Sequence, residues 1–353
     1  MVLILIFASG IYVLGRLMGA SRLATGGVLS VLFAAVALIQ LTLPDGHPLR
    51  AATGGSIKAW AMLAGVALVI GLYSLMLGWL KRRAPQPAPA APQSETAQQG
   101  PFSGEELERY ARHIVLREIG GSGQQRLKQA RVLVVGAGGL GSPVLLYLAA
   151  AGVGTIAVVD DDTVSLSNLQ RQVLHNGAVI GMAKVLSAKQ ALAAINPHVE
   201  VIALQNRLNA ENAPALMAGY DLVLDGSDNF ATRYLVNATC VALELPLISA
   251  AISQWEGQIS LYHPASGAPC YACVFPAAPA DGLAPSCAEA GVMGALPGVV
   301  GSMMAVEAIK FITGAGPVLK GEMLIYDALY GESRKLRVER RADCETCGTK
   351  AVG

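Results

Sequence analysis

Two pairs of closely spaced cysteines could bind a metal ion. Cys270 and Cys273 form one Cys-x-x-Cys pair, and Cys344 and Cys347 form the other. Four thiolates bind Zn²⁺ as a closed tetrahedral set that leaves no coordination position for a substrate. We therefore expect a structural zinc site that ties the C-terminal tail to the body of its domain. Thioredoxin-like redox chemistry is the alternative for either pair taken alone.

A glycine-rich turn at residues 136–141 (GAGGLG) is the second chemical feature. Glycines let the backbone turn tightly and approach phosphate groups, which the N-terminus of the following helix then holds. Asp160 follows about twenty residues later, where a carboxylate accepts hydrogen bonds from ribose hydroxyls. The pattern predicts a nucleotide site, and the same fingerprint also serves NAD and FAD.

Charged residues after the glycine turn favour ATP over a dinucleotide. Arg171 and Lys184 follow Asp160, and two fixed cations can neutralise charge that develops on phosphate oxygens. Asp228 follows another predicted strand, at the edge of the sheet where ligands bind, and its carboxylate suits Mg²⁺. Surface ion pairing is the alternative for each cation alone. The sequence contains no G-x-x-x-x-G-K-[ST] motif, which disfavours a P-loop enzyme.

An alternation of strands and helices is expected to position these residues. It predicts a Rossmann-like α/β fold with a mostly parallel sheet that is covered on both faces. Ser103 and Glu106 form a capping pattern that opens the domain with a helix. We expect parallel strands at residues 131–135, 155–159, 199–204, 222–225 and 247–251, antiparallel strands at 258–262, 323–326 and 333–338, and helices at 140–151, 184–195 and 229–243.

Three apolar runs precede this domain, at residues 3–18, 27–43 and 59–80. The third has about twenty residues without a charge, enough to cross a bilayer core of ~30 Å. Lys81, Arg82 and Arg83 follow it directly, and such a basic cluster marks the cytoplasmic side. We expect two to three transmembrane helices in the inner membrane and a catalytic domain in the cytoplasm. Buried core helices and a signal peptide are the alternatives.

Composition agrees with a division into three parts. Hydrophobic residues make up 53% of the 353 residues and charged residues 14%, against about a quarter charged in soluble domains. A net charge of +1 provides no field that would recruit nucleic acid, so no nucleic-acid partner is expected. We expect a membrane region at residues 1–83, a flexible linker at 84–102 and the catalytic domain at 103–353.

Four motifs in this order resemble the ThiF/MoeB/HesA family, bacterial relatives of ubiquitin-activating enzymes. They are residues 109–116 (RYARHIVL), the glycine turn, residues 165–172 (SLSNLQRQ) and residues 227–229 (SDN). The resemblance covers residues 103–348 and is strongest to the molybdopterin-synthase adenylyltransferases of molybdenum cofactor biosynthesis. It implies ATP, Mg²⁺, a structural Zn²⁺ and a homodimer with two sites.

The resemblance also implies a role for each matching residue. Arg112 would reach across the dimer into the partner's ATP site, and Asp228 would hold Mg²⁺ beside the α-phosphate. We predict as catalytic Arg112, Arg171, Lys184, Asp228 and Cys287. We predict as nucleotide-binding Gly136, Gly138, Gly139, Gly141, Asp160, Asp162, Ser167, Asn168, Leu169, Gln170, Arg171, Lys184, Asp228 and Asn229.

The implied activity is ATP-dependent adenylation of the C-terminal Gly-Gly carboxylate of a small ubiquitin-like sulfur-carrier protein. The small subunit of molybdopterin synthase is the first candidate carrier, and a thiamine-pathway carrier is the second. Cys287 stands in a turn-rich segment that favours an accessible thiolate, and whether it forms a covalent intermediate stays open. Rival interpretations are a tRNA threonylcarbamoyladenosine dehydratase-like enzyme, a dinucleotide oxidoreductase and a membrane scaffold. We recognise no sulfurtransferase-like domain after Gly348 and expect a separate sulfur donor.

Overall fold

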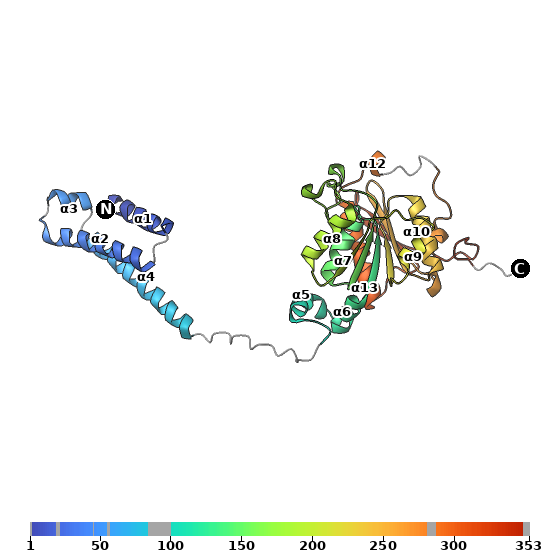
Figure 1. Cartoon of the computed structure of the whole chain (residues 1–353), viewed down its shortest axis with the longest axis horizontal. Coiled ribbons are helices and arrows are strands. Elements are labelled where there is room, and N and C mark those ends of the chain that lie inside the picture. Colours follow the sequence, from blue (N-terminus) through green and yellow to red (C-terminus); the bar gives the residue numbers. More distant parts are fainter. Residues whose placement is uncertain are drawn as a thin grey trace. The chain divides into compact units, whose positions relative to one another are not determined.

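The structure is a computed structural model that describes residues 2–18, 22–44, 46–54, 57–83, 100–280 and 287–348. The chain divides into two compact units, Met1–Ala97 and Gln98–Gly353, which Figure 1 shows in the colours of the sequence. Each unit has its own packing, and the site described below lies within the second.

The first unit is helical. Its elements are α1 (Val2–Leu17), α2 (Arg22–Thr42), α3 (Pro48–Thr53) and α4 (Ile57–Arg83). The rings of Phe33 and Trp60 join α2 to α4 edge to face, with centroids 5.8 Å apart. Gln40 Nε2 donates to Thr53 Oγ1 over 2.8 Å, so α3 is fixed to the end of α2. The segment between the second and third apolar runs thus contains a short helix.

Two helices in the described part of the chain are long and apolar enough to cross a membrane, judged by length and composition. They are Ala24–Thr42, of which 17% is buried, and Leu296–Thr313, of which 50% is buried. The second lies in the core of the other unit, where it packs on two neighbouring helices and two strands. Transmembrane helices in the first unit stay a prediction.

An eight-stranded sheet organises the second unit. Its strands are β1 (Arg131–Val135), β2 (Thr155–Val159), β3 (Glu200–Leu204), β4 (Leu222–Asp225), β5 (Leu247–Ile252), β6 (Glu256–Tyr262), β7 (Glu322–Asp327) and β8 (Glu332–Arg337). They lie in the order β3-β2-β1-β4-β5-β6-β7-β8. Neighbouring strands in the series β3-β2-β1-β4-β5 are parallel. The pairs β5–β6, β6–β7 and β7–β8 are antiparallel. This confirms the predicted fold class, with strand ends within one or two residues of those expected.

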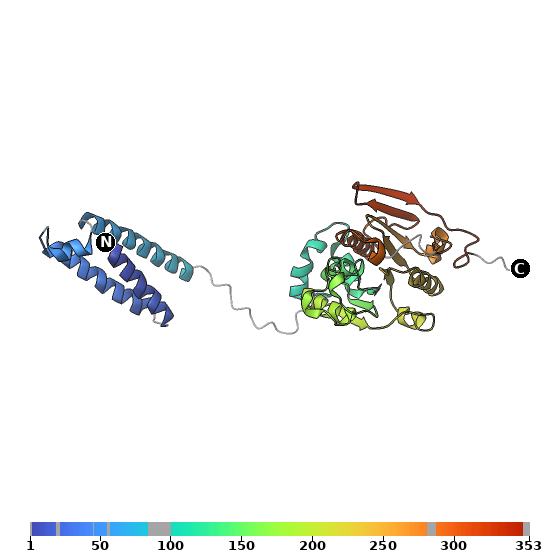
Figure 2. The same cartoon turned by 90° about the horizontal axis from the view of Figure 1, so that it is seen from above.

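Helices cover both faces of this sheet (Figures 1 and 2). Alternate residues of β1 show why: Val132 and Val134 belong to one apolar cluster, whereas Leu133 and Val135 belong to the other. Because side chains of a strand alternate between faces, two such clusters require two helical layers. One layer holds α6 (Gly120–Gln129), α7 (Gly141–Ala151), α8 (Lys184–Ile195) and α13 (Leu296–Thr313), and the other holds α9 (Ala213–Met217) and α10 (Phe230–Ala242).

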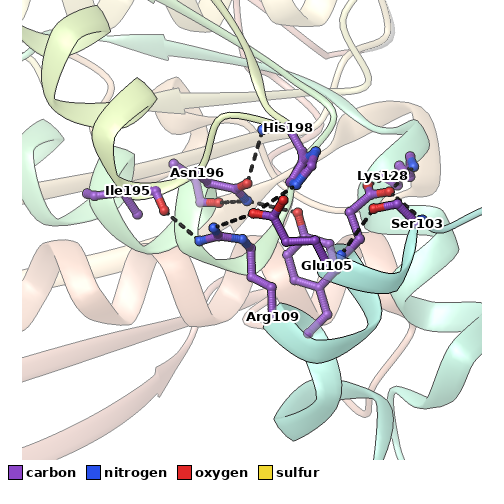
Figure 3. A network of polar contacts seen from close by, with 10 residues as sticks. Ser103, Glu105, Arg109, Lys128, Ile195, Asn196 and His198 are labelled. Carbon is purple, nitrogen blue, oxygen red and sulfur yellow. Dashed lines mark hydrogen bonds and ion pairs between the residues drawn. The ribbon is translucent and has the colours of Figure 1, made fainter. Parts of the chain in front are cut away.

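A polar network fixes the first helix of this unit, α5 (Gly104–Ile114), to the end of α8 (Figure 3). Arg109 donates to the Ile195 carbonyl over 2.7 Å and pairs with Glu105 at 3.3 Å. The hydrogen bond from Arg109 lowers the pKa of the Glu105 carboxyl. Ser103 and Glu106 form the expected capping box at the start of the helix. The network therefore sets the position of the exposed Arg112 in the last turn of α5.

Candidate nucleotide site and cysteine cluster

Strand register brings three site segments to one edge of the sheet. Val135 at the end of β1 lies opposite Val159 of β2 and Asp225 of β4. The residues that follow these strands therefore emerge side by side, although they are far apart in the sequence. This carboxyl edge is where open α/β sheets bind their ligands.

The glycine turn has a backbone that only glycine tolerates. Gly136 has a φ of +92°, which lies in the left-handed region. A Cβ on Gly141 would lie 1.9 Å from the Gly136 carbonyl oxygen, so no side chain fits there. The turn leads directly into α7, in which the Ser142 N–H donates to the Gly138 carbonyl over 2.9 Å and Pro143 has no N–H. An anion at this edge would therefore be held by backbone N–H groups that precede Ser142.

Two side chains hold this turn in place. The Asp160 carboxylate accepts from the backbone N–H of Ala137 over 2.8 Å and from that of Asp162 over 2.9 Å. His175 is buried, its Nε2 lies 2.9 Å from the Ala137 carbonyl, and its Nδ1 lies 2.8 Å from Ser187 Oγ. A carbonyl only accepts, so Nε2 carries the proton. Burial lowers the pKa of His175, which favours this neutral form.

The two predicted cations reach the same region from different elements. Lys184 begins α8 and is buried, and its Nζ pairs with Asp162 Oδ2 at 2.8 Å. Arg171 follows a short turn and donates to the Ser167 carbonyl over 3.4 Å. The partner of Lys184, Asp162, keeps 70% of its side chain exposed. This carboxylate can therefore move into solvent when an anion takes its place beside the ammonium.

A buried polar network supports the loop after β4. Asp225 is fully buried and accepts from the Ser227 N–H over 2.9 Å and from Ser249 Oγ over 3.1 Å. Arg233 in the first turn of α10 is also buried and donates to the carbonyls of Ser227 and Ala250. The network leaves the next residue, Asp228, exposed at the edge of the sheet.

A cavity of about 1070 Å³ lies along this edge. It is wide enough for a nucleotide and the end of a second substrate. Nine of the predicted nucleotide residues are among those that line it: Gly136, Gly138, Gly139, Asp160, Asp162, Arg171, Lys184, Asp228 and Asn229.

Other predicted residues lie outside this lining. Within the described part of the chain, Gly141, Ser167, Asn168, Leu169 and Gln170 do not line the cavity, and a role for them in binding stays a prediction.

The structure leaves the predicted roles of the two remaining catalytic residues untested. Arg112 is exposed and does not line the cavity of its own chain among the residues described, which leaves its expected role across a dimer as a prediction. Cys287 is the first residue of the short helix α12 (Cys287–Ala290). The segment before it, residues 281–286, lies outside the described residues.

Sequence reasoning missed several residues of the cavity. Gln172, Arg207, Ser227, Arg233 and Gln254 also line it. Gln172 and Ser227 stand inside motifs that were recognised, next to residues that were selected. Arg233 had no signal in the sequence, because only the fold turns this helix charge inward.

The four paired cysteines form a separate buried cluster. The Sγ atoms of Cys270 and Cys344 lie 3.6 Å apart, and those of Cys273 and Cys347 lie 3.4 Å apart. All four lie within 4.8 Å of one another. Zn–S bonds of about 2.3 Å in a tetrahedron place sulfur atoms about 3.8 Å apart. The cluster therefore fits Zn²⁺, as its spacing predicts.

The surroundings of the cluster favour a thiolate at Cys344, whereas burial raises the pKa of Cys270 and of Cys347. Burial acts to raise the pKa of Cys344, but backbone N–H groups of Cys347 and Thr346 bring it down to about 7. The backbone N–H of Arg341 also points at Cys273 Sγ over 3.5 Å. Thiolate is the form that binds a metal, so Cys344 is prepared for one, and metal binding would release protons from Cys270 and Cys347.

Comparison with known proteins assigns this chain to a family. The sequence profile of the ThiF family matches residues 110–346, which is more than half of the chain. The chain belongs to the ThiF family. The resemblance found in the four motifs is thereby confirmed, and the family match spans the glycine turn, the residues that line the cavity, the pair Cys270 and Cys273, and Cys344.

Named relatives of this ThiF-family chain differ in length. A sulfur carrier protein adenylyltransferase of Thermus thermophilus is 52% identical over 248 residues, which cover 69% of this chain and 92% of that protein. The bovine adenylyltransferase and sulfurtransferase MOCS3 is 47% identical over 264 residues, or 74% of this chain and 58% of that protein. The maize adenylyltransferase and sulfurtransferase MOCS3-1 is 44% identical over 260 residues, or 73% of this chain and 55% of that protein. The chain thus spans a little over half of these longer relatives.

Solved structures with the same fold are more distant in sequence. E. coli MccB with MccA-N7isoASN has a TM-score of 0.62 at 24% identity, over 68% of this chain and 75% of that one. PaaA has a TM-score of 0.60 at 22% identity, over 88% of this chain and 90% of that one. At these identities the likeness shows the fold alone.

Proposed function

We propose that this chain adenylates the C-terminal glycine carboxylate of a small ubiquitin-like sulfur-carrier protein, with ATP as the second substrate. The observation that carries the proposal is the convergence of Arg171, Lys184 and Asp228 on one cavity beside the glycine turn. The identity to an adenylyltransferase that is named for a sulfur carrier protein supports the choice of substrate.

The charges around the cavity suit an attack on a phosphorus atom. A carboxylate oxygen of the carrier would form a bond to the α-phosphorus, and the bond to the leaving pyrophosphate oxygen would break. The attacking carboxylate is already ionised, so the step requires no general base. Lys184 and Arg171 would stabilise the charge on the phosphate oxygens, and the cavity would align the two reactants.

Asp228 is the residue that we assign to Mg²⁺. Its carboxylate is exposed at the edge of the sheet, where it offers oxygen ligands of the kind that Mg²⁺ prefers. The ion, when bound, would neutralise phosphate charge. Asn229 beside it caps α10 by accepting from the Thr232 N–H over 2.9 Å, which fixes the backbone that carries Asp228.

A homodimer and a membrane anchor complete the proposal. Arg112 is exposed on a helix that the polar network of α5 holds rigidly, so it is free to enter the site of a second copy. Large apolar side chains are exposed along α4, among them Met62 (71%), Val69 (66%) and Leu75 (72%). A bilayer would cover such a surface, and the cytoplasm would hold the catalytic unit.

The experiment that tests the activity is ATP–pyrophosphate exchange with purified full-length protein in detergent. We expect exchange only when a carrier that ends in Gly-Gly is present, and none when the carrier lacks its last glycine. No exchange with any such carrier, from protein that binds ATP, would refute the activity.

The identity of the carrier can be decided in the same assay. We propose the small subunit of molybdopterin synthase as the preferred carrier, in line with relatives that carry the MOCS3 name. The measurement is kcat/KM for this subunit beside kcat/KM for a thiamine-pathway carrier. A higher value for the thiamine-pathway carrier would reassign the chain to that pathway.

A further inference from the structure

One buried hydroxyl at the edge of the cavity has no structural use in the described part of the chain. Ser227 lines the cavity and is 9% exposed, and its Oγ has no hydrogen-bond partner among the described residues. Its backbone is fully engaged, because its N–H donates to Asp225 and its carbonyl accepts from Arg233. The hydroxyl is the polar group of Ser227 that remains for a ligand.

Other buried serines of the same unit show that this is unusual. Their hydroxyls each have a partner at 2.7–3.1 Å. Ser260 Oγ, for example, donates to the Glu322 carbonyl over 2.7 Å. Burying a polar group without a partner costs free energy, and proteins keep such groups where a ligand supplies the partner. The serines compared are Ser142, Ser187, Ser249 and Ser260.

The neighbours of Ser227 indicate which part of a ligand it would meet. A Cβ on Gly136 would lie 3.6 Å from the Ser227 backbone nitrogen, so Ser227 packs on the first residue of the glycine turn. Ser227 also directly precedes Asp228. It stands between the turn that suits phosphates and the carboxylate that suits Mg²⁺.

We propose that Ser227 Oγ donates a hydrogen bond to a phosphate oxygen of bound ATP, an inference that rests on the proposed function. Phosphate oxygens only accept, and a hydroxyl is the donor that Ser227 can offer. The buried contacts from Asp225 and Arg233 fix the backbone of Ser227, so the nucleotide would not have to order this part of the loop.

The test compares Ser227→Ala with Ser227→Thr and with the matched variant Ser260→Ala. Calorimetry measures the affinity for Mg·ATP, ligand-observed NMR measures the affinity for adenosine, and a thermal melt measures Tm. Ser227→Ala should bind Mg·ATP about tenfold more weakly, as expected for a lost hydrogen bond to a charged group. Its affinity for adenosine should not change, and its Tm should stay the same or rise.

The other two variants separate binding from folding. Ser227→Thr keeps a hydroxyl and should restore the affinity for Mg·ATP. Ser260→Ala should lower Tm, because it removes the hydrogen bond from this buried serine to the carbonyl of the half-buried Glu322, and should leave the affinity for Mg·ATP unchanged.

Three results would overturn the inference. Equal affinity of wild type and Ser227→Ala for Mg·ATP would refute it while leaving the proposed function intact. A parallel loss of adenosine affinity or of Tm in Ser227→Ala would show a structural role instead. Wild-type protein that binds no ATP would overturn the inference and the proposed function together.

Discussion

The cysteine cluster and the nucleotide cavity are built in opposite ways. The cluster takes four identical groups from two short segments and buries all of them. The cavity takes unlike groups from the ends of several strands and helices and leaves about 1070 Å³ between them. A closed set of ligands can only hold the fold together, whereas an open, charged cavity can exchange substrates. Damage to the first should therefore appear as lost stability, and damage to the second as lost activity.

Removal of the metal should give the largest effect. We expect Cys270→Ser, which deletes one ligand, to lower Tm strongly, because metal binding contributes on the order of 10 kcal/mol to folding in zinc-finger peptides. Zinc content and Tm are the measurements, and Cys240→Ala is the control because this buried cysteine lies outside the cluster. Cys270→Ser with unchanged zinc content and Tm would contradict a structural metal.

Substitution of the buried Lys184 should lower activity and leave stability nearly unchanged. Lys184→Met should lower kcat of pyrophosphate exchange by about 10²- to 10³-fold, as for the loss of one preorganised donor to a developing charge. Its Tm should change little, since its partner Asp162 is mostly exposed. Lys189→Met on an exposed position of the same helix is the control. A loss of Tm with normal kcat would remove Lys184 from the site.

Substitution of the buried Arg233 should lower both stability and nucleotide affinity, because this side chain supports the fold and also lines the cavity. Arg233→Met leaves the carbonyls of Ser227 and Ala250 without a donor, which costs about 1–3 kcal/mol. We expect a lower midpoint in urea and also a weaker affinity for Mg·ATP, because the loop that carries Asp228 loses its support. Normal affinity at a reduced midpoint would limit Arg233 to folding.

The smallest effect should come from the histidine that holds the glycine turn. Burial lowers the pKa of His175 below the ordinary value of 6.5. Below pH 6.5 the unfolded chain then binds more protons than the folded one. The contribution of His175 to the free energy of unfolding is therefore fully present above this pH and decreases as the pH falls towards the folded pKa. His175→Gln should lose less stability than wild type between pH 7 and pH 5, measured by urea unfolding. An identical pH dependence would mean that His175 does not titrate in this way.

The features of this molecule that could be predicted from the sequence are those that depend on local sequence patterns. The strands, the capping box at Ser103 and the Cys-x-x-Cys pairs depend on neighbours in the sequence, and the structure confirms them. Contacts between distant segments could not be predicted in the same way. Arg233 and Ser227 join the site only because β4 and β5 lie side by side, which buries the side chain of Ser227 and places the buried side chain of Arg233 next to Ser249 of β5. The pairing of Lys184 with Asp162 likewise depends on how the chain returns to the sheet.

The most direct test of the central claim is a crystal structure of the chain with Mg²⁺ and a non-hydrolysable ATP analogue. We predict that the triphosphate lies against Gly138 and Gly139, that Lys184 and Arg171 contact phosphate oxygens at about 2.7–2.9 Å, and that Asp228 binds the metal ion. A triphosphate bound elsewhere, or in the cavity with both cations turned away from it, would contradict the account.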